Sequence, residues 1–462
     1  MEKILVKDVA QAVHALNVVG NNEGYIQSVI TDSREKKLNS LFVAIKGENV
    51  DGHKYIKGAY ENGAVAVLVN ENFEDFSETI TYIVVKDTVK ALQDFATWYR
   101  LRFDIPVVAV TGSVGKTTTK DMIYSVLKEK YNVLKTEGNL NSEIGAPMTI
   151  LNLNSACDIA VIEMGMDHFG QIDTISKIVK PETAVITNIG VAHIEFLKSR
   201  ENILKAKCEV LDNMDKTGTA ILNIDDDMLS SVKKDLNIVW YGEGENANVR
   251  AENIVVDYNN GKVKAKVFAN GNKYELVIPG LSRHLVHAAL SAIAVGLKYN
   301  MDMESILKGI ANYTHTKMRM DIYNLNENIL LIDDTYNANP VSMKALIDVL
   351  AKMDKKKILI MGDMFELGEN EVNLHKEVLE YAISLNMDKI VLTGNIMKSA
   401  VGMVDKNKIS YFNSKEELIE NLNNIIEKDS VIGVKASRGM KFENITEKVI
   451  EIYGSLWYII GK

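Results

Sequence analysis

The segment 107–118 constrains the fold of this 462-residue chain more than any other. An apolar run leads into a turn that contains Gly112 and Gly115, and a helical pattern begins at Lys116. A strand that enters a helix through a glycine turn is typical of the phosphate-binding units of α/β proteins. The match to G-x-x-x-x-G-K-[ST] is imperfect, because Val110 stands at the first glycine position. The alternative is a plain glycine turn followed by an exposed lysine, and we favour phosphate binding.

Strand-like and helix-like runs alternate along most of the chain, which predicts an α/β fold with a mostly parallel sheet. The runs in the middle of the chain are expected strands at 105–111, 158–163, 183–187 and 219–223 and an expected helix at 116–130. Within 249–278, two alternating runs flank Asn-Asn-Gly at 259–261, which predicts an antiparallel hairpin. The alternation restarts near residue 328, with strands expected at 329–333, 357–362, 388–392 and 430–434.

These patterns predict three domains, since a chain of this length exceeds one ordinary core. A small N-terminal α/β domain is expected over residues 1–84, with strands at 41–45 and 64–69. The central P-loop domain is expected over 85–313, and it includes the hairpin. A C-terminal Rossmann-like α/β domain is expected over 314–462.

Composition excludes several classes of function. The net charge of −9 gives no general electrostatic reason to bind nucleic acid or an anionic membrane. The two cysteines, Cys157 and Cys208, have neither metal-ligand spacing nor the density of a disulfide scaffold. No signal peptide is evident, and no run approaches the about 20 apolar residues that span a bilayer. We therefore expect a cytoplasmic protein, without membrane insertion or nucleic-acid partners, and a monomer.

Two further strands end in residues suited to magnesium. Glu163 ends one strand, and Asn188 and His193 follow the next. Ligands of open α/β sheets bind at the carboxyl ends of the strands, so these residues should lie beside the phosphate loop. Magnesium prefers oxygen ligands that it shares with phosphates, which makes Glu163 a natural ligand. By itself His193 is more often a hydrogen-bonded loop residue, and Glu163 a solvated strand end.

Taken together, these segments resemble the Mur ligase family. The resemblance covers almost the whole chain in the right order, through segments 31–34, 41–53, 111–118, 139–147, 163–170, 187–193, 206–209, 333–343, 362–368 and 435–440. It implies that the chain binds the UDP end of a peptidoglycan precursor in its N-terminal domain. The segments after residue 333 are similar to those of the branch that adds D-alanyl-D-alanine to UDP-N-acetylmuramoyl-tripeptide. This resemblance implies a ligase in which ATP converts the tripeptide carboxylate into an acyl phosphate, which the amine of the dipeptide then attacks.

The resemblance also implies cofactors and residue roles. It implies two magnesium ions, one of them on a carbamylated lysine at the position of Lys207. From the residues alone, Lys207 reads as a surface lysine on an amphipathic helix. The implied catalytic residues are Lys116, Lys207, His193 and Arg319, and the implied metal ligands are Thr117, Glu163, His193 and Lys207.

The remaining implied contacts are to ATP and to the two other substrates. The implied ATP-binding residues are Thr111, Gly112, Ser113, Val114, Gly115, Lys116, Thr117, Thr118, Asn188, Arg319 and Asp334. The implied substrate-binding residues are Ser33, Arg34, Asn139, Asn141, Tyr336 and Asn337. Because Arg319 and Asp334 belong to the third domain, the site should be complete only when that domain closes onto the second.

One segment departs from the family pattern. Family members usually have His-Asn-Val-x-Asn-Ala before the helix that contacts adenine, and here Leu285 and Ala288 replace both asparagines. His287 is either a substitute contact or a helix-surface residue. Three alternatives stay open: the preceding amino-acid-adding step, a nucleotide-binding regulatory protein with lapsed catalysis, and either diaminopimelate or lysine as the third residue of the acceptor peptide.

Overall fold

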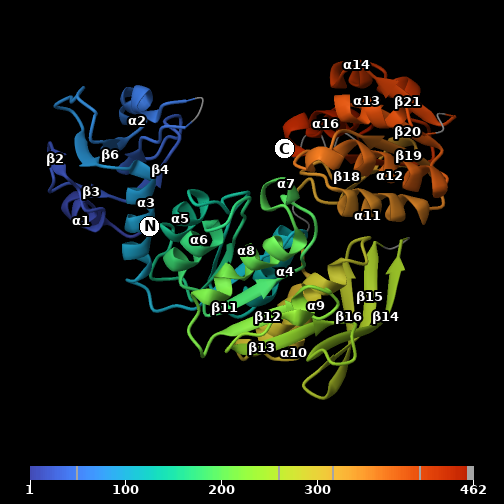
Figure 1. The fold of residues 1–462 in the computed structure, drawn as a ribbon, viewed down its shortest axis with the longest axis horizontal. Helices are drawn as coiled ribbons and strands as arrows, with labels where there is room; N and C mark the ends of the chain where they lie inside the picture. Colours follow the sequence, from blue (N-terminus) through green and yellow to red (C-terminus); the bar gives the residue numbers. More distant parts are fainter. Residues whose placement is uncertain (48–49, 259–260, 315–316, 405–406, 455–462) are drawn as a thin grey trace.

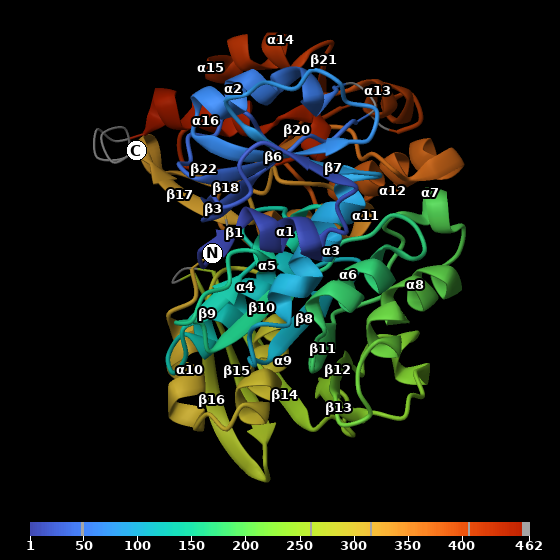
Figure 2. The same cartoon turned by 90° about the vertical axis from the view of Figure 1, so that its left-hand side faces the viewer.

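The computed structural model describes residues 1–47, 50–258, 261–314, 317–404 and 407–454. These residues form three lobes, each built around its own sheet (Figure 1). The N-terminal and C-terminal lobes lie on the same side of the middle lobe, as the turned view also shows (Figure 2). The α/β fold class predicted from the alternating pattern is confirmed.

The N-terminal lobe contains a five-stranded sheet and a short two-stranded one. The larger sheet has the order β2 (Asn17–Val19), β7 (Thr81–Val85), β6 (Ala64–Asn70), β5 (Ser40–Val43) and β4 (Ser28–Ile30), and only β2 runs antiparallel. The smaller sheet pairs β1 (Ile4–Leu5) with β3 (Tyr25–Ile26), and the lobe's helices are α1 (Val6–Ala12) and α2 (Ile56–Glu61).

A helix links the first two lobes. Asp87 caps α3 (Thr88–Arg100), which packs against α1 and also against α5 (Gly145–Ile150) and α6 (Gln171–Val179) of the middle lobe. One hydrophobic cluster therefore runs from the N-terminal lobe into the middle lobe without interruption. The two lobes share a core, and the division at residue 84 stays a prediction.

The middle lobe is built on a nine-stranded sheet. Its order is β16 (Asn272–Pro279), β15 (Lys262–Ala269), β14 (Val249–Asp257), β13 (Asn237–Gly242), β12 (Thr219–Asn223), β11 (Thr183–Ile186), β8 (Val107–Thr111), β10 (Ile159–Glu163) and β9 (Val133–Lys135). The strands from β9 to β14 are parallel, and β14, β15 and β16 pair antiparallel. The predicted hairpin strands are confirmed, whereas turn residues 259–260 lie outside the described residues.

Helices cover both faces of this sheet because its central strands are apolar on both sides. On β8, Val108 and Val110 belong to one buried cluster, and Val107 and Ala109 to the other. One face carries α4 (Lys116–Leu127), α9 (Leu285–Lys298) and α10 (Met303–Ala311), and the other carries α5, α6 and α8 (Arg200–Asp212). The short helix α7 (Ile194–Leu197) precedes α8.

The C-terminal lobe repeats the layered plan with six strands. Their order is β17 (Asp321–Leu325), β18 (Ile329–Asp333), β22 (Ser430–Lys435), β19 (Lys356–Met361), β20 (Lys389–Thr393) and β21 (Ile409–Phe412), with β17 an antiparallel edge. The helices are α11 (Pro340–Ala351), α12 (Glu371–Ser384), α13 (Asn395–Val401), α14 (Lys415–Glu420), α15 (Leu422–Ile425) and α16 (Glu443–Tyr453). Within the described ranges of all three lobes, no helix is both long and apolar enough to cross a membrane.

Candidate functional site

The phosphate loop has the geometry that its two glycines predict. Gly112 follows β8 with φ +149°, and a Cβ there would lie 1.9 Å from the Thr187 hydroxyl oxygen. Gly115 has φ +83° and stands at the N-terminus of α4. A side chain at position 112 would collide with Thr187, the residue that follows β11. A residue other than glycine at position 115 would strain the backbone. The predicted strand–turn–helix unit is therefore present.

The start of α4 offers unpaired backbone donors to an anion. No side chain caps this helix, and the N–H of Thr119 donates to the carbonyl of Gly115 at 2.9 Å. The four preceding amides of an α-helix have no partner within the helix. Thr117 is buried and Thr118 is half-buried on this first turn. Amides and helix dipole together favour a phosphate at this position.

Asn188 holds the phosphate loop from the neighbouring strand end. Its side chain accepts from the N–H of Val114 and donates to the carbonyl of the same residue, both at 2.9 Å. The Thr187 hydroxyl donates to that carbonyl at 2.7 Å, and Ser113 exchanges further bonds with Asn188 and Gly190. Asn188 is predicted to contact ATP; its amide is engaged with the loop, and the residue also lines the cavity. Sequence reasoning missed the supporting role of Thr187.

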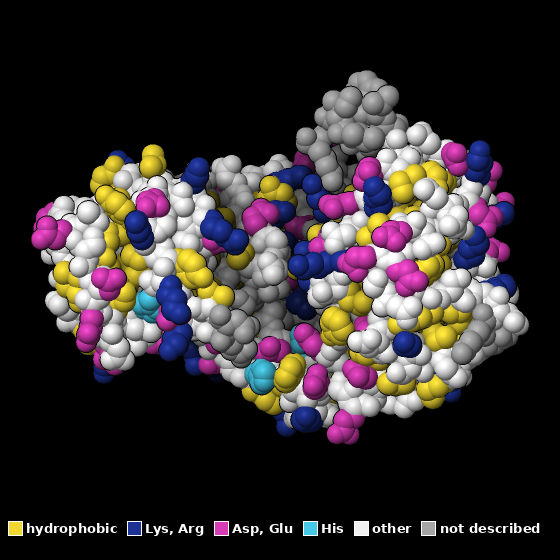
Figure 3. Space-filling model, turned by 90° about the horizontal axis from the view of Figure 1, so that it is seen from above, with side chains coloured by type: hydrophobic (Ala, Val, Ile, Leu, Met, Phe, Trp, Pro, Cys, Tyr) yellow, Lys and Arg dark blue, Asp and Glu magenta, His cyan; other side chains and the backbone are white. Residues whose placement is uncertain are grey.

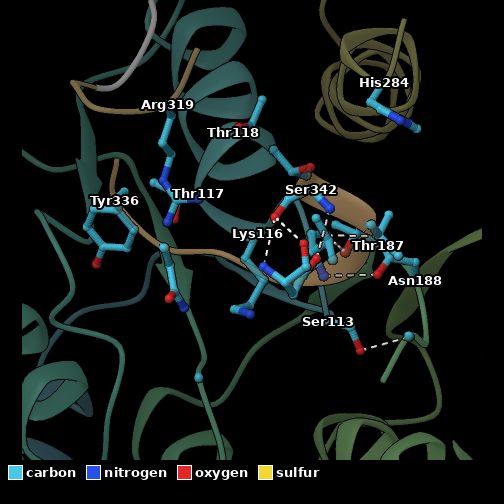
Figure 4. A pocket seen from close by; sticks show the side chains of 18 of the residues that line it. Ser113, Lys116, Thr117, Thr118, Thr187, Asn188, His284, Arg319, Tyr336 and Ser342 are labelled. Carbon is cyan, nitrogen blue, oxygen red and sulfur yellow. Dashed lines mark hydrogen bonds between the residues drawn. The ribbon is translucent and has the colours of Figure 1, made fainter. Parts of the chain in front are cut away.

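Lys116 points back over the loop. Its Nζ donates to the carbonyl of Gly112 at 2.7 Å, beside Thr117 and Arg319 in the same cavity (Figure 4). Burial lowers the pKa of the Lys116 ammonium, and nearby Arg319 lowers it further, whereas Glu163 raises it. An anion in the cavity would counteract the lowering of the Lys116 pKa, because an opposite charge favours the ammonium form.

Glu163 carries an unpaired carboxylate oxygen. The side chain is 2% exposed; its Oε1 accepts from the Asn141 amide at 2.7 Å, while its Oε2 is buried without a hydrogen-bond partner. A buried carboxylate oxygen without a partner is costly, and a cation would relieve that cost. The donor set therefore fits a magnesium ion. Asn139 lines the same cavity, next to Asn141.

His193 lies on the loop after β11 and reaches the third lobe. Its Nδ1 is 2.9 Å from Oε2 of Glu366, although the angle is not that of a hydrogen bond. Contact with the imidazole lowers the pKa of the Glu366 carboxyl. Both residues line the cavity with Glu163.

Lys207 is buried, so its interpretation as a surface lysine is wrong. It is 1% exposed on α8, where sequence reasoning had placed it on the polar face. Burial lowers the pKa of this amine well below its ordinary value, and the charge of Lys116 adds to that effect. It is not among the residues that line the cavity.

Arg319 extends from the third lobe to the phosphate loop. Its guanidinium carbon lies 4.1 Å from the centre of the Tyr336 ring, and its Nε is buried without a hydrogen-bond partner. Met318 and Met320 on either side have φ of +63° and +54°. Stacking on an aromatic face holds a guanidinium while leaving its donors free for phosphate.

Beneath this arginine lies a buried ion pair that sequence reasoning missed. Lys435 Nζ is 2.5 Å from Oδ2 of Asp334 and 2.9 Å from the carbonyl of Asn337. Asp334 also accepts from the N–H of Met320 at 3.1 Å. Asp334 and Asn337 were predicted to contact ligands, and their contacts here shape the loops around Arg319.

One cavity of about 1210 Å³ joins these groups, with lining residues from the middle and C-terminal lobes. The surface is hollowed between the N-terminal and C-terminal lobes, and Lys and Arg side chains gather along the hollow (Figure 3). Ser33 and Arg34 do not line the cavity; they follow β4, and Arg34 is 88% exposed in an ion pair with Asp32. That pairing lowers the pKa of Asp32 to about 2.

The far end of the cavity contains the segment that departs from the family pattern. Leu285 and Ala288 line it and are 6% and 5% exposed. His287 is not free helix surface, because its Nε2 is 3.0 Å from Oδ2 of Asp225. Burial lowers the pKa of His284, which faces the cavity from the start of α9 (Figure 4).

Three segments of the chain match known protein families. Residues 25–100 match "Mur ligase family, catalytic domain", residues 110–296 match "Mur ligase middle domain", and residues 318–438 match "Mur ligase, glutamate ligase domain". The chain is 36% identical over 461 residues to a UDP-N-acetylmuramoyl-tripeptide–D-alanyl-D-alanine ligase of Bacillus subtilis (98% of this chain, 99% of the relative).

Solved structures give the same picture. A crystal structure of MurF from Acinetobacter baumannii is similar with a TM-score of 0.89 and 31% identity, over 98% of this chain and 99% of that one. A MurF ligase from Thermotoga maritima in complex with ADP is similar with a TM-score of 0.80 and 28% identity, over 92% and 97%.

Proposed function

Because this chain belongs to the Mur ligase family, as its sequence predicts, we propose that it joins D-alanyl-D-alanine to UDP-N-acetylmuramoyl-tripeptide with cleavage of ATP to ADP and phosphate. It is an ATP-dependent ligase of peptidoglycan precursor synthesis. The observation that carries the proposal is the meeting of Lys116, Arg319 and the unpaired oxygen of Glu163 at one cavity between two lobes.

The reaction has two displacements. An oxygen of the tripeptide's terminal carboxylate attacks the γ-phosphorus of ATP, the bond to the bridging oxygen breaks, and ADP leaves. The amine nitrogen of D-alanyl-D-alanine then attacks the acyl carbon, the carbon–oxygen bond to phosphate breaks, and phosphate leaves as the amine loses a proton. Phosphoryl transfer depends mainly on positioning and on neutralising charge.

We assign that work to the phosphate loop and to the third lobe. The amides at the start of α4 and Lys116 bind the β- and γ-phosphates, with Ser113, Val114, Thr117 and Thr118 around them. Arg319 donates to the γ-phosphate from the opposite side. Asn188 acts indirectly, because its amide fixes Val114 and thus the loop. Asp334 acts the same way on the Arg319 segment.

We assign the magnesium sites to Thr117, Glu163, His193 and Lys207. When bound, magnesium would neutralise charge on the transferring phosphoryl group. Asn141 turns the Glu163 carboxylate so that Oε2 stays available. Carbamylation of Lys207 requires a neutral amine, and its lowered pKa supplies one. A ¹³C-bicarbonate NMR signal that disappears in Lys207→Met would identify the carbamate; an unchanged signal would place it elsewhere.

We assign the two other substrates to the hollow between the lobes. Ser33 and Arg34 hold the UDP end, Asn139 and Asn141 lie along the peptide, and Tyr336 and Asn337 contact the dipeptide. Lys and Arg side chains along this hollow suit a diphosphate (Figure 3). We further propose a monomer that works in the cytoplasm, and domain divisions near 84 and 313.

An isotope experiment tests this function. The acceptor is prepared with ¹⁸O in its terminal carboxylate and incubated with ATP, magnesium, bicarbonate and D-alanyl-D-alanine. We expect one ¹⁸O in the released phosphate and a product heavier than the acceptor by one dipeptide. Unlabelled phosphate would mean ATP hydrolysis without carboxylate activation. A product heavier by a single amino acid, formed when diaminopimelate or lysine is supplied with the dipeptide precursor, would assign the preceding step instead.

A further inference from the structure

The segment 363–366 of the third lobe, which we call the arm, is anchored by hydrogen bonds and has no role in the reaction as proposed above. It follows β19, and it is hydrogen-bonded to three other elements. The Asp363 carboxylate accepts from the N–H of Met397 at the start of α13, at 2.8 Å. The N–H of Met364 donates to His375 on α12, at 2.8 Å. The N–H of Phe365 donates to the Ser437 hydroxyl after β22, also at 2.8 Å.

At the end of this arm, Glu366 crosses to the middle lobe. Its φ of +63° is left-handed, and His193, which it meets, has φ +62°. Left-handed conformations are uncommon for residues other than glycine, and where the surroundings enforce them they cluster at functional sites. The Glu366 Oε2 lies 2.9 Å from His193 Nδ1. Gly368, two residues on, packs against Glu195 of α7, so the contact between lobes extends beyond one pair.

We propose that Glu366 is a positioning residue that orients the His193 imidazole from the third lobe. The carboxylate already lies 2.9 Å from Nδ1, and when a cation holds the ring it accepts the Nδ1 proton, which leaves the Nε2 lone pair for the cation beside Glu163. Metal-binding histidines almost always donate their other ring N–H to a carboxylate, carbonyl or water. The inference rests on the metal role proposed for His193.

This arrangement ties the cation site to the position of the third lobe. The arm is bonded within its own lobe, so the carboxylate moves as that lobe moves. When the third lobe is in place, His193 is held in one tautomer and orientation. When it swings away, the imidazole loses this partner and the cation site loses affinity. Cation binding and lobe closure therefore favour each other.

Metal affinity tests this role without relying on turnover. Mn²⁺ is titrated into the full chain with ADP at a fixed concentration, and water-proton relaxation reports the protein-bound ion. We expect Glu366→Ala to weaken Mn²⁺ binding about tenfold or more, and Glu366→Gln to weaken it less because the amide oxygen still accepts a proton. Glu369→Ala, at an exposed glutamate just beyond this segment, should bind as the unaltered chain does.

A double-mutant cycle separates positioning from general damage. In a His193→Asn background, Glu366→Ala should cause no further loss, since the residue it orients is gone. Equal affinity of Glu366→Ala, Glu366→Gln and the unaltered chain would overturn the proposal, and so would losses that add fully in the double variant. If the unaltered chain binds Mn²⁺ with ADP but releases no phosphate with its proposed substrates, the proposed function fails and this inference stands.

Discussion

The phosphate loop of the middle lobe and the 318–320 segment of the third lobe line the same cavity but are held in different ways. The backbone of the loop is hydrogen-bonded at Val114 by Thr187 and Asn188, which follow the neighbouring strand β11. The 318–320 segment is held by the Tyr336 ring and by the N–H of Tyr336, which donates to the Met318 carbonyl at 3.1 Å. It is also held by Asp334, which accepts from the N–H of Met320 and forms a buried ion pair with Lys435. The phosphate loop is therefore fixed by neighbouring strands of its own sheet, whereas the position of Arg319 depends on a separate lobe.

Removing the ammonium of the loop should have the largest effect. Lys116→Ala leaves the loop bonds of Asn188 in place, so the fold should persist while γ-phosphate stabilisation is lost. We expect kcat/KM for phosphate release to fall by about 10³-fold. Steady-state kinetics with a thermal-unfolding control measure it. A fall below tenfold would mean that the loop amides suffice.

Breaking the buried ion pair should destabilise the third lobe. Lys435→Ala leaves Asp334 buried without its cation, and loss of one partner of such a pair costs about 3 kcal/mol. Denaturant unfolding measures this cost, with Lys356→Ala as the control because its pair with Glu427 is exposed. Equal unfolding free energies for both variants would show that the third lobe does not depend on this pair.

Removing the arginine tests the contribution of the third lobe. Arg319→Ala should lower kcat by about 100-fold, or about 2.7 kcal/mol, because its donors are lost from the transition state. Tyr336→Phe keeps the ring face under Arg319 and should stay within threefold, roughly the value of one exposed hydrogen bond. Similar losses in the two variants would assign the effect to the tyrosine hydroxyl instead.

Loosening the loop should have the smallest effect of the four. Asn188→Ala removes two bonds to Val114 but no phosphate contact in our assignment, so we expect KM for ATP to rise about tenfold with kcat nearly unchanged. Initial-rate measurements over ATP concentration separate the two. A loss in kcat as large as that of Lys116→Ala would make Asn188 a direct contact.

The difference between the two regions also explains what the sequence could predict. The phosphate loop is local: strand, glycine turn and helix follow one another in the chain, and the predicted strand 219–223 coincides with β12. Glu163 and Asn188 were placed beside the loop because parallel strands end at one edge. The sequence could not say that Asn188 bonds to the loop, because that depends on how two strand ends pack.

Long-range packing accounts for the rest. Lys207 looked exposed because the apolar positions of α8 seemed to cover the opposite face, and only the tertiary structure shows that Lys207 is buried as well. Lys435 and Asp334 are 101 positions apart, and Glu366 meets His193 across two lobes. Pairs of that kind leave no periodic signal in a single sequence.

The central claim is that this chain activates the tripeptide carboxylate with ATP and then transfers it to the dipeptide. The most direct test is phosphate release from ATP with UDP-N-acetylmuramoyl-tripeptide, with and without D-alanyl-D-alanine, in magnesium and bicarbonate. We predict sustained release only when both substrates are present, and its loss in Lys116→Ala. Release that is absent with both substrates, or that proceeds equally without either one, would contradict the account.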